Sequence, residues 1–371
     1  MYTADPAPLV YNDTVYLYVG HDEDGSRSYN LREWRVFTST DMVNWQDHGS
    51  PMNLATFAWV SDRAWAGHVV PRNGKFYWYV PVRRRGGRMA IGVGVSDSPT
   101  GPFRDAIGRP LVENGEIDPH VFVDADGQAY LYWGNPRLWY IKLNEDMISY
   151  QGGITAIPLT AGGFGTRTDN PDRPTTFEEG PWVYKRNDIY YLVYPANCCP
   201  DDLRYSTATG PTGPWTYRGL IMASQGTSST NHPGIIDYKN STYMFYHNSF
   251  LPGGGSYTRS VAVERFEYSA NGSIPMLTMT TTGAPQVGTL DPYVRQEAET
   301  MAFSSDLKTE VCSEGGMNVN MVHNGDYIKV KGVSFGTGAN SFTARVASAA
   351  SGGGSSCAWV PFPAHLSALA P

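Results

Sequence analysis

The chain has 371 residues, a formal net charge of −7 and a sequence pI of about 5.6. This length accommodates one large domain and a smaller piece, and the acidic balance argues against a nucleic-acid partner. No apolar run is long enough to span a membrane, and the four cysteines follow neither a disulfide framework nor the ligand spacing of a zinc site.

The first residues, MYTADPAPLVY, are predicted to form a strand from the start, with no basic or apolar leader. We therefore expect no signal peptide here, and the localisation stays open. Aromatic residues make up 13% of the chain, and 40 Gly and 26 Pro are spread along it. Short aromatic strands interrupted by turns are typical of an all-β protein.

Five segments repeat one pattern at intervals of 53 to 61 residues. Each has a polar or aromatic residue, then a small residue or proline, an apolar run, a turn and an aromatic strand. The segments begin at Asp5, Trp65, Asp118, Glu179 and His232. The expected hairpin turns are Asn12-Asp13, Asn73-Gly74, Asp126-Gly127, Asn187-Asp188 and Asn240-Ser241. Each repeat predicts about four antiparallel strands, so residues 1–285 are predicted to form a five-bladed β-propeller.

The residue that opens the first strand of each blade is expected at one mouth of the central channel. Three carboxylates, a tryptophan and a histidine would then meet there. Like charges held together resist joint ionisation, so at least one of these carboxyl groups should have a raised pKa. Paired carboxyl groups of different pKa suit glycoside hydrolysis, and aromatic rings suit sugar binding. The alternative is that the acids cap strand ends or bind a structural cation.

The stretch FEEGPW places Glu178 directly before Glu179. Glu179 has the same phase in its repeat as Asp5 and Asp118, whereas Glu178 is one residue out of phase. Because successive strand residues face opposite sides, Glu178 is expected to point away from the channel as an ordinary charge.

Four blocks of the chain resemble those of glycoside hydrolase family 43, and most closely its β-xylosidase and α-L-arabinofuranosidase members. They are TADPAPLVYNDTVYLYVGHDED, IDPHVFVDADGQAYLYWGN, FEEGPWVYKRNDIYYLVY and NHPGIID. The resemblance implies a five-bladed propeller that hydrolyses with inversion. It also implies that Asp5 is the general base, Glu179 is the general acid, and Asp118 orients the acid and tunes its pKa.

Four further residues are candidates for binding the sugar or a cation. Trp65 is expected to form a wall of the sugar site or to pack at the channel mouth. The resemblance implies that Arg259 contacts the substrate and the tuning aspartate; a surface arginine beside Glu264 is the alternative. It also implies that His232 lies beside a channel cation, usually calcium, held mostly by water because calcium prefers oxygen ligands. A metal-free, hydrogen-bonded histidine is the alternative, and His247 is a poorer second candidate.

The stretch RRRGGR, residues 83–88, is the one basic cluster. It lies between two predicted strands of blade two, and we expect a solvated hairpin loop. A place on the rim of a sugar cleft is the alternative.

Residues 296–354, after a linker at 286–295, resemble the first half of a family 6 carbohydrate-binding module. A complete sandwich needs about 100 residues, so we expect a partial β-sandwich segment with no sugar binding of its own. Residues 355–371 continue neither the strands nor the module, and we expect a disordered tail. The module remnant favours a secreted protein.

The sequence therefore predicts an all-β fold, a five-bladed β-propeller with a C-terminal partial β-sandwich segment. The expected activity is an inverting exo-hydrolase that releases β-D-xylose from xylooligosaccharides, and in addition α-L-arabinofuranose from arabinoxylan side chains. The alternatives are arabinofuranosidase as the main activity, or a non-catalytic sugar-binding propeller.

Overall fold

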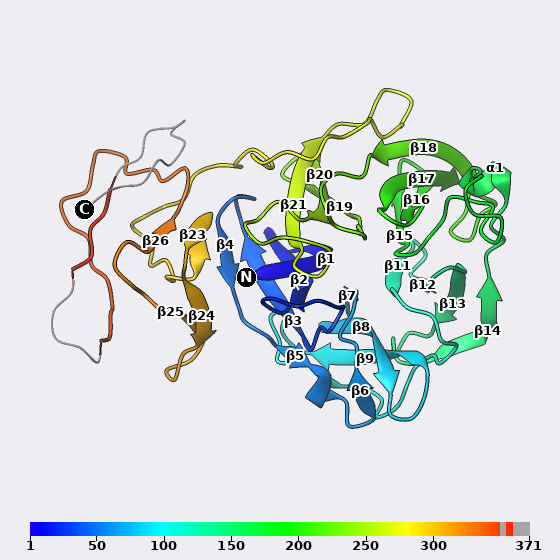
Figure 1. The fold of residues 1–371 in the computed structure, drawn as a ribbon, viewed down its shortest axis with the longest axis horizontal. Helices are drawn as coiled ribbons and strands as arrows, with labels where there is room; N and C mark the ends of the chain where they lie inside the picture. The colour runs from blue at the N-terminus through cyan, green and yellow to red at the C-terminus, as the bar shows by residue number, and fades with distance from the viewer. Residues whose placement is uncertain (349–353, 359–371) are drawn as a thin grey trace.

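The computed structural model describes residues 1–348 and 354–358. Five antiparallel sheets stand around a common centre (Figure 1), which confirms the predicted five-bladed propeller. Among the described residues, no helix has both the length and the apolar character needed to cross a membrane.

Blades one and two contain the first ten strands. Blade one consists of β1 (Tyr2–Tyr11), β2 (Thr14–Asp22), β3 (Glu33–Ser39), β4 (Trp45–Asp47) and β5 (Met52–Asn53), followed by the 3-10 helix η1 (Leu54–Thr56). Its order is β1-β2-β3-β4, and β5 pairs with β3. Blade two consists of β6 (Val60–Asp62), β7 (His68–Arg72), β8 (Lys75–Arg84), β9 (Met89–Ser96) and β10 (Arg104–Asp105), with both β6 and β7 paired to β8.

Blades three and four have four strands each, in chain order, and blade five has three. Blade three is β11 (His120–Val123), β12 (Ala129–Trp133), β13 (Trp139–Leu143) and β14 (Tyr150–Ala156). The short helix α1 (Ala161–Phe164) precedes blade four, which is β15 (Trp182–Arg186), β16 (Ile189–Ala196), β17 (Asp202–Ala208) and β18 (Thr216–Met222). Blade five is β19 (Gly234–Tyr238), β20 (Ser241–Asn248) and β21 (Ser260–Phe266).

The hairpin turns lie close to their predicted places. Asn12 and Asp13 both have positive φ, as do Asn187 and Asp188, which two-residue hairpin turns of this kind require. In blade five the predicted turn, Asn240-Ser241, lies one residue too far toward the C-terminus. Tyr238 pairs with Ser241, so the turn residues are Lys239 and Asn240.

Aromatic side chains fill the space between neighbouring blades. The largest fully buried ones include Trp34, Trp78 and Trp133, one from each of the first three blades. The ring of blades is closed where Tyr238 of blade five donates its hydroxyl hydrogen to the carbonyl oxygens of Asp13 (2.9 Å) and Thr40 (2.7 Å) of blade one. This packing fixes the inner strands around the axis and so positions the channel mouth.

The C-terminal segment lies beside β4 (Figure 1). Its strand β22 (Thr300–Met301) pairs with β4 and so extends the sheet of blade one. The remaining strands form two separate two-stranded sheets, β23 (Phe303–Ser305) with β26 (Tyr327–Lys329), and β24 (Lys308–Val311) with β25 (Met317–Asn320). The expected partial sandwich is thus a set of small sheets, and its exact boundaries stay a prediction. Of the tail expected to be disordered, residues 359–371 lie outside the described residues.

Candidate active site

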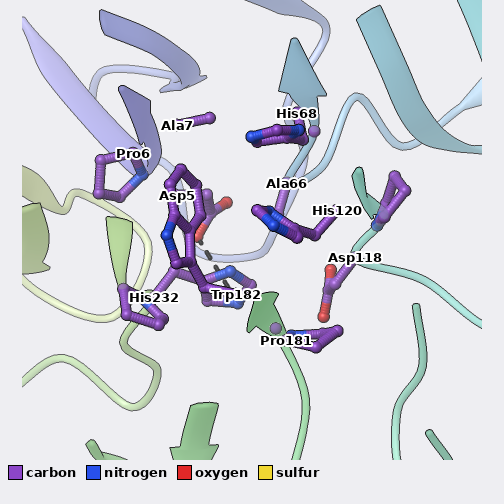
Figure 2. A pocket seen from close by; sticks show the side chains of 14 residues that line it. Asp5, Pro6, Ala7, Ala66, His68, Asp118, His120, Pro181, Trp182 and His232 are labelled. Atoms are coloured by element: carbon purple, nitrogen blue, oxygen red, sulfur yellow. Dashed lines mark ion pairs between the residues drawn. The ribbon is translucent and has the colours of Figure 1, made fainter. Parts of the chain in front are cut away.

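Four of the five residues that open the repeats meet at the channel mouth. The channel is lined by side chains from all five blades, among them Asp5, Asp118 and His232 (Figure 2). Glu179 joins this group through His232. In blades two to five these residues precede their strands by two or three positions, so they lie on the segments that lead into the inner strands.

Asp5 lies inside β1, at a break in that strand. The pairing of β1 with β2 shifts between Ala4 and Ala7, and Asp5 has φ +56°, in the left-handed region that aspartate tolerates better than most residues. Its backbone amide donates to Nδ1 of His247 at 3.1 Å, and Nε2 of His247 donates to the carbonyl of Thr230 at 2.7 Å. Burial is the main cause that lowers the pKa of His247 well below its usual range. A neutral histidine agrees with these two bonds, because one ring nitrogen accepts and the other donates.

Arg259 is buried between two carboxylates. Its Nε and Nη2 donate to the two oxygens of Asp22, each at 2.9 Å, and its Nη1 donates to Oδ1 of Asp5 at 3.0 Å. The alternative of a surface arginine beside Glu264 is wrong, because Arg259 is only 3% exposed. Among the described residues, the Arg259 side chain bonds to Asp22, Asp5 and Thr230, and not to Asp118. At the channel mouth Arg259 contacts the carboxylate of Asp5, whereas the resemblance implied a contact with Asp118.

Glu179 has a polar partner on each oxygen. Nε2 of His232 lies 3.2 Å from Oε1, and the side-chain amide of Asn135 donates to Oε2. The glycine that follows allows this close approach: Gly180 has φ +50°, and a Cβ there would lie 3.0 Å from two atoms of the His232 ring. The same His232 nitrogen lies 4.0 Å from Oδ1 of Asp5. The distance between Oδ1 of Asp5 and Oε1 of Glu179 therefore cannot exceed the sum of their distances to Nε2 of His232.

Asp118 confirms the expectation of a raised pKa. Burial is the main cause that raises the pKa of this carboxyl group well above its usual range, and the negative charge of Glu179 raises it further. Asp118 has φ +62°, and its Oδ2 is buried without a hydrogen-bond partner among the described residues. A carboxyl group in this setting favours its protonated form.

His232 provides positive charge among these acids. Burial lowers the pKa of His232, but the charge of Asp5 and the hydrogen bond to Glu179 outweigh burial, and the pKa rises to about 10. Ligand atoms of Asp118, Glu179 and His232 lie within 4.8 Å of one another, so the three make a candidate metal-binding cluster.

Glu178 points away from the channel, as predicted, but it is not an ordinary solvated charge. It is 3% exposed, and its Oε2 accepts from Nη1 of Arg167 at 3.0 Å and from the backbone amide of Cys198. A second arginine, Arg173, pairs with Oε1. Both arginines come from the long segment before blade four, which the repeat pattern does not cover. Cys198 itself forms a disulfide with Cys199.

Trp65 lies one layer away from the acids. Its indole nitrogen donates to the carbonyl of Tyr29 at 2.9 Å, and the channel is instead lined by the next residues, Ala66, Gly67 and His68. The Tyr29 ring in turn lies under the guanidinium of Arg259, 5.2 Å from ring centre to Cζ. Trp65 and Tyr29 therefore form a wall beside Asp5 and Arg259.

Three polar residues near the acids were missed by the repeat pattern. They are Asp22, which holds Arg259, Asn135, which holds Glu179, and Asp201, which is 2% exposed and has a pKa raised first by burial and then by the charge of Glu179. Each lies at or beyond the end of a second strand, where the chain turns back toward the third. A polar residue between the second and third strands of each repeat is the sequence signal that could have identified these three residues.

Comparison with known proteins identifies this arrangement. Residues 1–274 match Glycosyl hydrolases family 43. The chain belongs to this family. It is accordingly a glycoside hydrolase, which confirms the resemblance, and residues 297–356 match Carbohydrate binding module (family 6).

Relatives in family 43 extend across both parts of the chain. The arabinoxylan arabinofuranohydrolase of Bacillus subtilis (strain 168) is 34% identical over 417 residues, covering 94% of this chain and 78% of the relative. A crystal structure of a family 43 arabinoxylan arabinofuranohydrolase from Bacillus subtilis in complex with cellotetraose has a TM-score of 0.75 and 30% identity, covering 88% of this chain and 77% of that one. A family 43 β-xylosidase/α-arabinofuranosidase from a compost microbial metagenome, solved with xylotriose in a calcium-free form, has a TM-score of 0.67 and 28% identity, covering 75% and 95%.

Proposed function

We propose that this protein is an inverting exo-hydrolase that releases terminal α-L-arabinofuranose and β-D-xylose from arabinoxylan fragments and xylooligosaccharides. The observation that carries the proposal is that Asp5 and Glu179 both lie close to Nε2 of His232, with Asp118 close to Glu179. The relatives named for arabinoxylan and xylose substrates support the choice of sugars. Arabinose is the expected main product, because the arabinoxylan-specific relative aligns with both parts of the chain.

Asp5 is proposed as the general base. Arg259 and the His247 contact hold this residue in its left-handed conformation, and the bond from Arg259 occupies only Oδ1. Oδ2 has no hydrogen bond recorded among the described residues and is free to take a proton from water. The activated water would attack the anomeric carbon on the face opposite the leaving group, as an inverting reaction requires.

Glu179 is proposed as the general acid that gives its proton to the leaving oxygen. Asn135 and His232 fix the orientation of this carboxyl group. Asp118 is proposed as a positioning residue. Its burial and its closeness to Glu179 disfavour two ionised carboxylates in this site. Inverting enzymes hold their two carboxyl groups about 6.5–9.5 Å apart to leave room for water. The His232 contacts set only an upper bound on the distance between Oδ1 of Asp5 and Oε1 of Glu179, and this bound falls in the lower part of that range.

Trp65 and Arg259 are proposed to contact the sugar. The aromatic rings of the Trp65–Tyr29 wall suit the C–H face of a sugar ring, and the wall contacts Arg259, which bonds to the base Asp5.

Product analysis tests the proposed substrates. Purified protein is incubated with xylobiose and with arabinosylated xylooligosaccharides, and the released sugars are followed by chromatography. We expect arabinose from the branched substrates, xylose from xylobiose, and neither sugar with the Asp5→Ala variant. Absence of both sugars with the wild-type protein, together with tight sugar binding, would contradict an enzyme and favour a sugar-binding propeller.

A calcium ion beside His232, held mostly by water so that Glu179 keeps its proton, belongs to this proposal. The cluster of Asp118, Glu179 and His232 fits calcium in part: the buried, unpartnered oxygen of Asp118 is the kind of donor that calcium prefers, whereas His232 must lose its proton before its nitrogen can bind. When bound, the ion would add positive charge beside the acidic groups of the site. We expect dialysis against EDTA to lower the melting temperature by several degrees and added calcium to restore it. An unchanged melting temperature and unchanged activity would exclude a functional ion.

A further inference from the structure

Blade two carries an excess of positive charge on the face that holds the candidate active site. Strand β7 starts at the channel with His68, which pairs with Tyr79 of β8, and it ends at Arg72, which pairs with Lys75. Strand β8 therefore runs back toward the channel mouth, and its turn into β9, residues 85–88, lies on the active-site face. Equivalent turns of other blades bring Tyr29, Asn135 and Arg259 to the site.

The charged residues at this turn are mainly arginines. We define the arginine rim as Arg83, Arg84, Arg85 and Arg88, from this turn and the adjoining end of β8, together with Arg63, which precedes β7 and shares Asp62 with Arg83. The carboxylates that pair with them are Asp62, which lies 3.2 Å from Arg63 and 3.3 Å from Arg83, and Glu113, which lies 3.1 Å from Arg84. Five cations thus face two anions in a protein whose net charge is −7.

The outer part of the arginine rim is open to solvent. Arg84, Arg85 and Arg88 are exposed, and the Arg84 side chain is 52% exposed. Arg85 donates through Nε to the carbonyl of Val60 at 3.1 Å, which leaves its terminal nitrogens available. No ion pair is recorded for Arg88 among the described residues.

A continuous series of contacts joins the arginine rim to the proposed base. Arg63 has φ +77°, an uncommon conformation for this residue type that surrounding contacts must hold. In this conformation its guanidinium lies over the Trp65 ring, 4.7 Å from the centre. Trp65 bonds to Tyr29, which lies under the Arg259 guanidinium, and Arg259 bonds to Asp5. A substrate seated at the Trp65 wall would therefore pass close to Arg63, which shares the carboxylate of Asp62 with Arg83.

We propose that the arginine rim binds a carboxylate carried by the substrate, such as a uronic acid substituent on a xylan-type oligosaccharide, and thereby favours acidic over neutral chains. The inference rests on the proposed function. Guanidinium groups bind carboxylates through two parallel hydrogen bonds, and a neutral sugar offers no charge that would use this excess.

The test compares two matched substrates. One is an arabinosylated xylooligosaccharide bearing one uronic acid, and the other is the same molecule with its carboxyl group reduced to an alcohol. We expect kcat/KM of the wild-type protein to be about fivefold higher for the acidic substrate at low salt, and this ratio to fall toward one in 0.5 M NaCl. The Arg84→Gln/Arg88→Gln double variant should lower the ratio to about one while activity on the reduced substrate stays unchanged.

Arg265→Gln is the matched control. Arg265 is also exposed, but it pairs with Tyr243 near the end of β21 that lies away from the channel mouth, so its loss should leave the ratio unchanged. A ratio near one in the wild-type protein, or a ratio that the double variant does not change, would overturn the proposal. Absence of hydrolysis of both substrates would instead contradict the proposed function. In that case calorimetric binding of the acidic substrate, weakened in the double variant, would still support the rim.

Discussion

Glu178 and Glu179 are adjacent and both buried, yet their surroundings give them different roles. Glu178 is enclosed by Arg167 and Arg173, whereas Glu179 meets His232 and Asn135 at the channel. The repeat phase distinguishes the two correctly, although both lie on the segment before β15 and not in a strand, so strand alternation is not the cause. It could not predict that Glu178 is buried, because both arginines belong to a segment without a repeat.

Glutamine at either position should separate the two roles. We expect Glu179→Gln to lower kcat on xylobiose by 10²- to 10⁴-fold, since its poor leaving group needs the proton, and to leave the melting temperature almost unchanged. Glu178→Gln should lower the free energy of unfolding by roughly 3 kcal/mol, because the buried Glu178 carboxylate and the 5% exposed side chain of Arg167 lose their ion pair, and should keep most of the activity of the folded enzyme. Steady-state kinetics and denaturant unfolding measure both. The reverse pattern would contradict the assignment.

The segments leading into the inner strands determine the geometry of the site. Asp5 and Asp118 both precede a proline, a position that normally favours extended backbone, yet both have left-handed φ values. Local sequence predicts the opposite conformation, so tertiary contacts must hold it, including the bond from the Asp5 amide to His247. The repeat therefore placed these aspartates at the mouth correctly, but their backbone conformation and partners could not be predicted from neighbouring residues.

The inner strands of blades two and three also share a buried histidine contact. The amide of Val121 donates to Nδ1 of His68 at 3.2 Å, and the His68 and His120 rings are 4.2 Å apart. Burial is the main cause that lowers the pKa of His68 well below its usual range, and the neighbouring His120 lowers it further. Below about pH 6.5 the unfolded chain therefore binds a proton that folded His68 does not, and the contribution of this group to stability is lost as pH falls.

Comparison with His68→Asn isolates this contribution, because asparagine can accept the same bond without titrating. We expect the free energy of unfolding of the wild-type protein, relative to the variant, to fall by about 1 kcal/mol per pH unit between pH 6 and pH 5. Urea unfolding at each pH measures it. A difference that stays constant or grows as pH falls would show that His68 is protonated in the folded protein.

At the scale of the whole molecule, the C-terminal segment depends on the propeller. Thr309 donates to Asp47 at 2.6 Å, and the Lys331 amide donates to Asn44 at 2.8 Å. Apolar side chains that a complete sandwich would bury are exposed instead, such as Val311 at 78% and Phe342 at 70%. The repeat predicted the number of blades, but the pairing of β22 with β4 involves strands of only two or three residues, which give no periodic signal.

Residues 290–371 expressed alone should not bind xylan. The segment has little core of its own and leaves its strand edges open, so it cannot maintain a sugar-binding surface without the propeller. A pull-down on insoluble xylan, with the full chain as the positive control, measures this. Detectable retention of the isolated segment would show that it folds and binds independently.

Inversion at the anomeric carbon is the central claim, since it depends on Asp5 activating water while Glu179 protonates the leaving oxygen. Proton NMR of xylobiose hydrolysis, recorded in the first minutes before mutarotation, identifies the anomer that forms first. We predict that α-xylose appears first from the β-linked substrate, and that Asp5→Ala forms neither anomer at a measurable rate. Initial release of β-xylose would contradict the account, because it would require a covalent intermediate and carboxyl groups only about 5 Å apart.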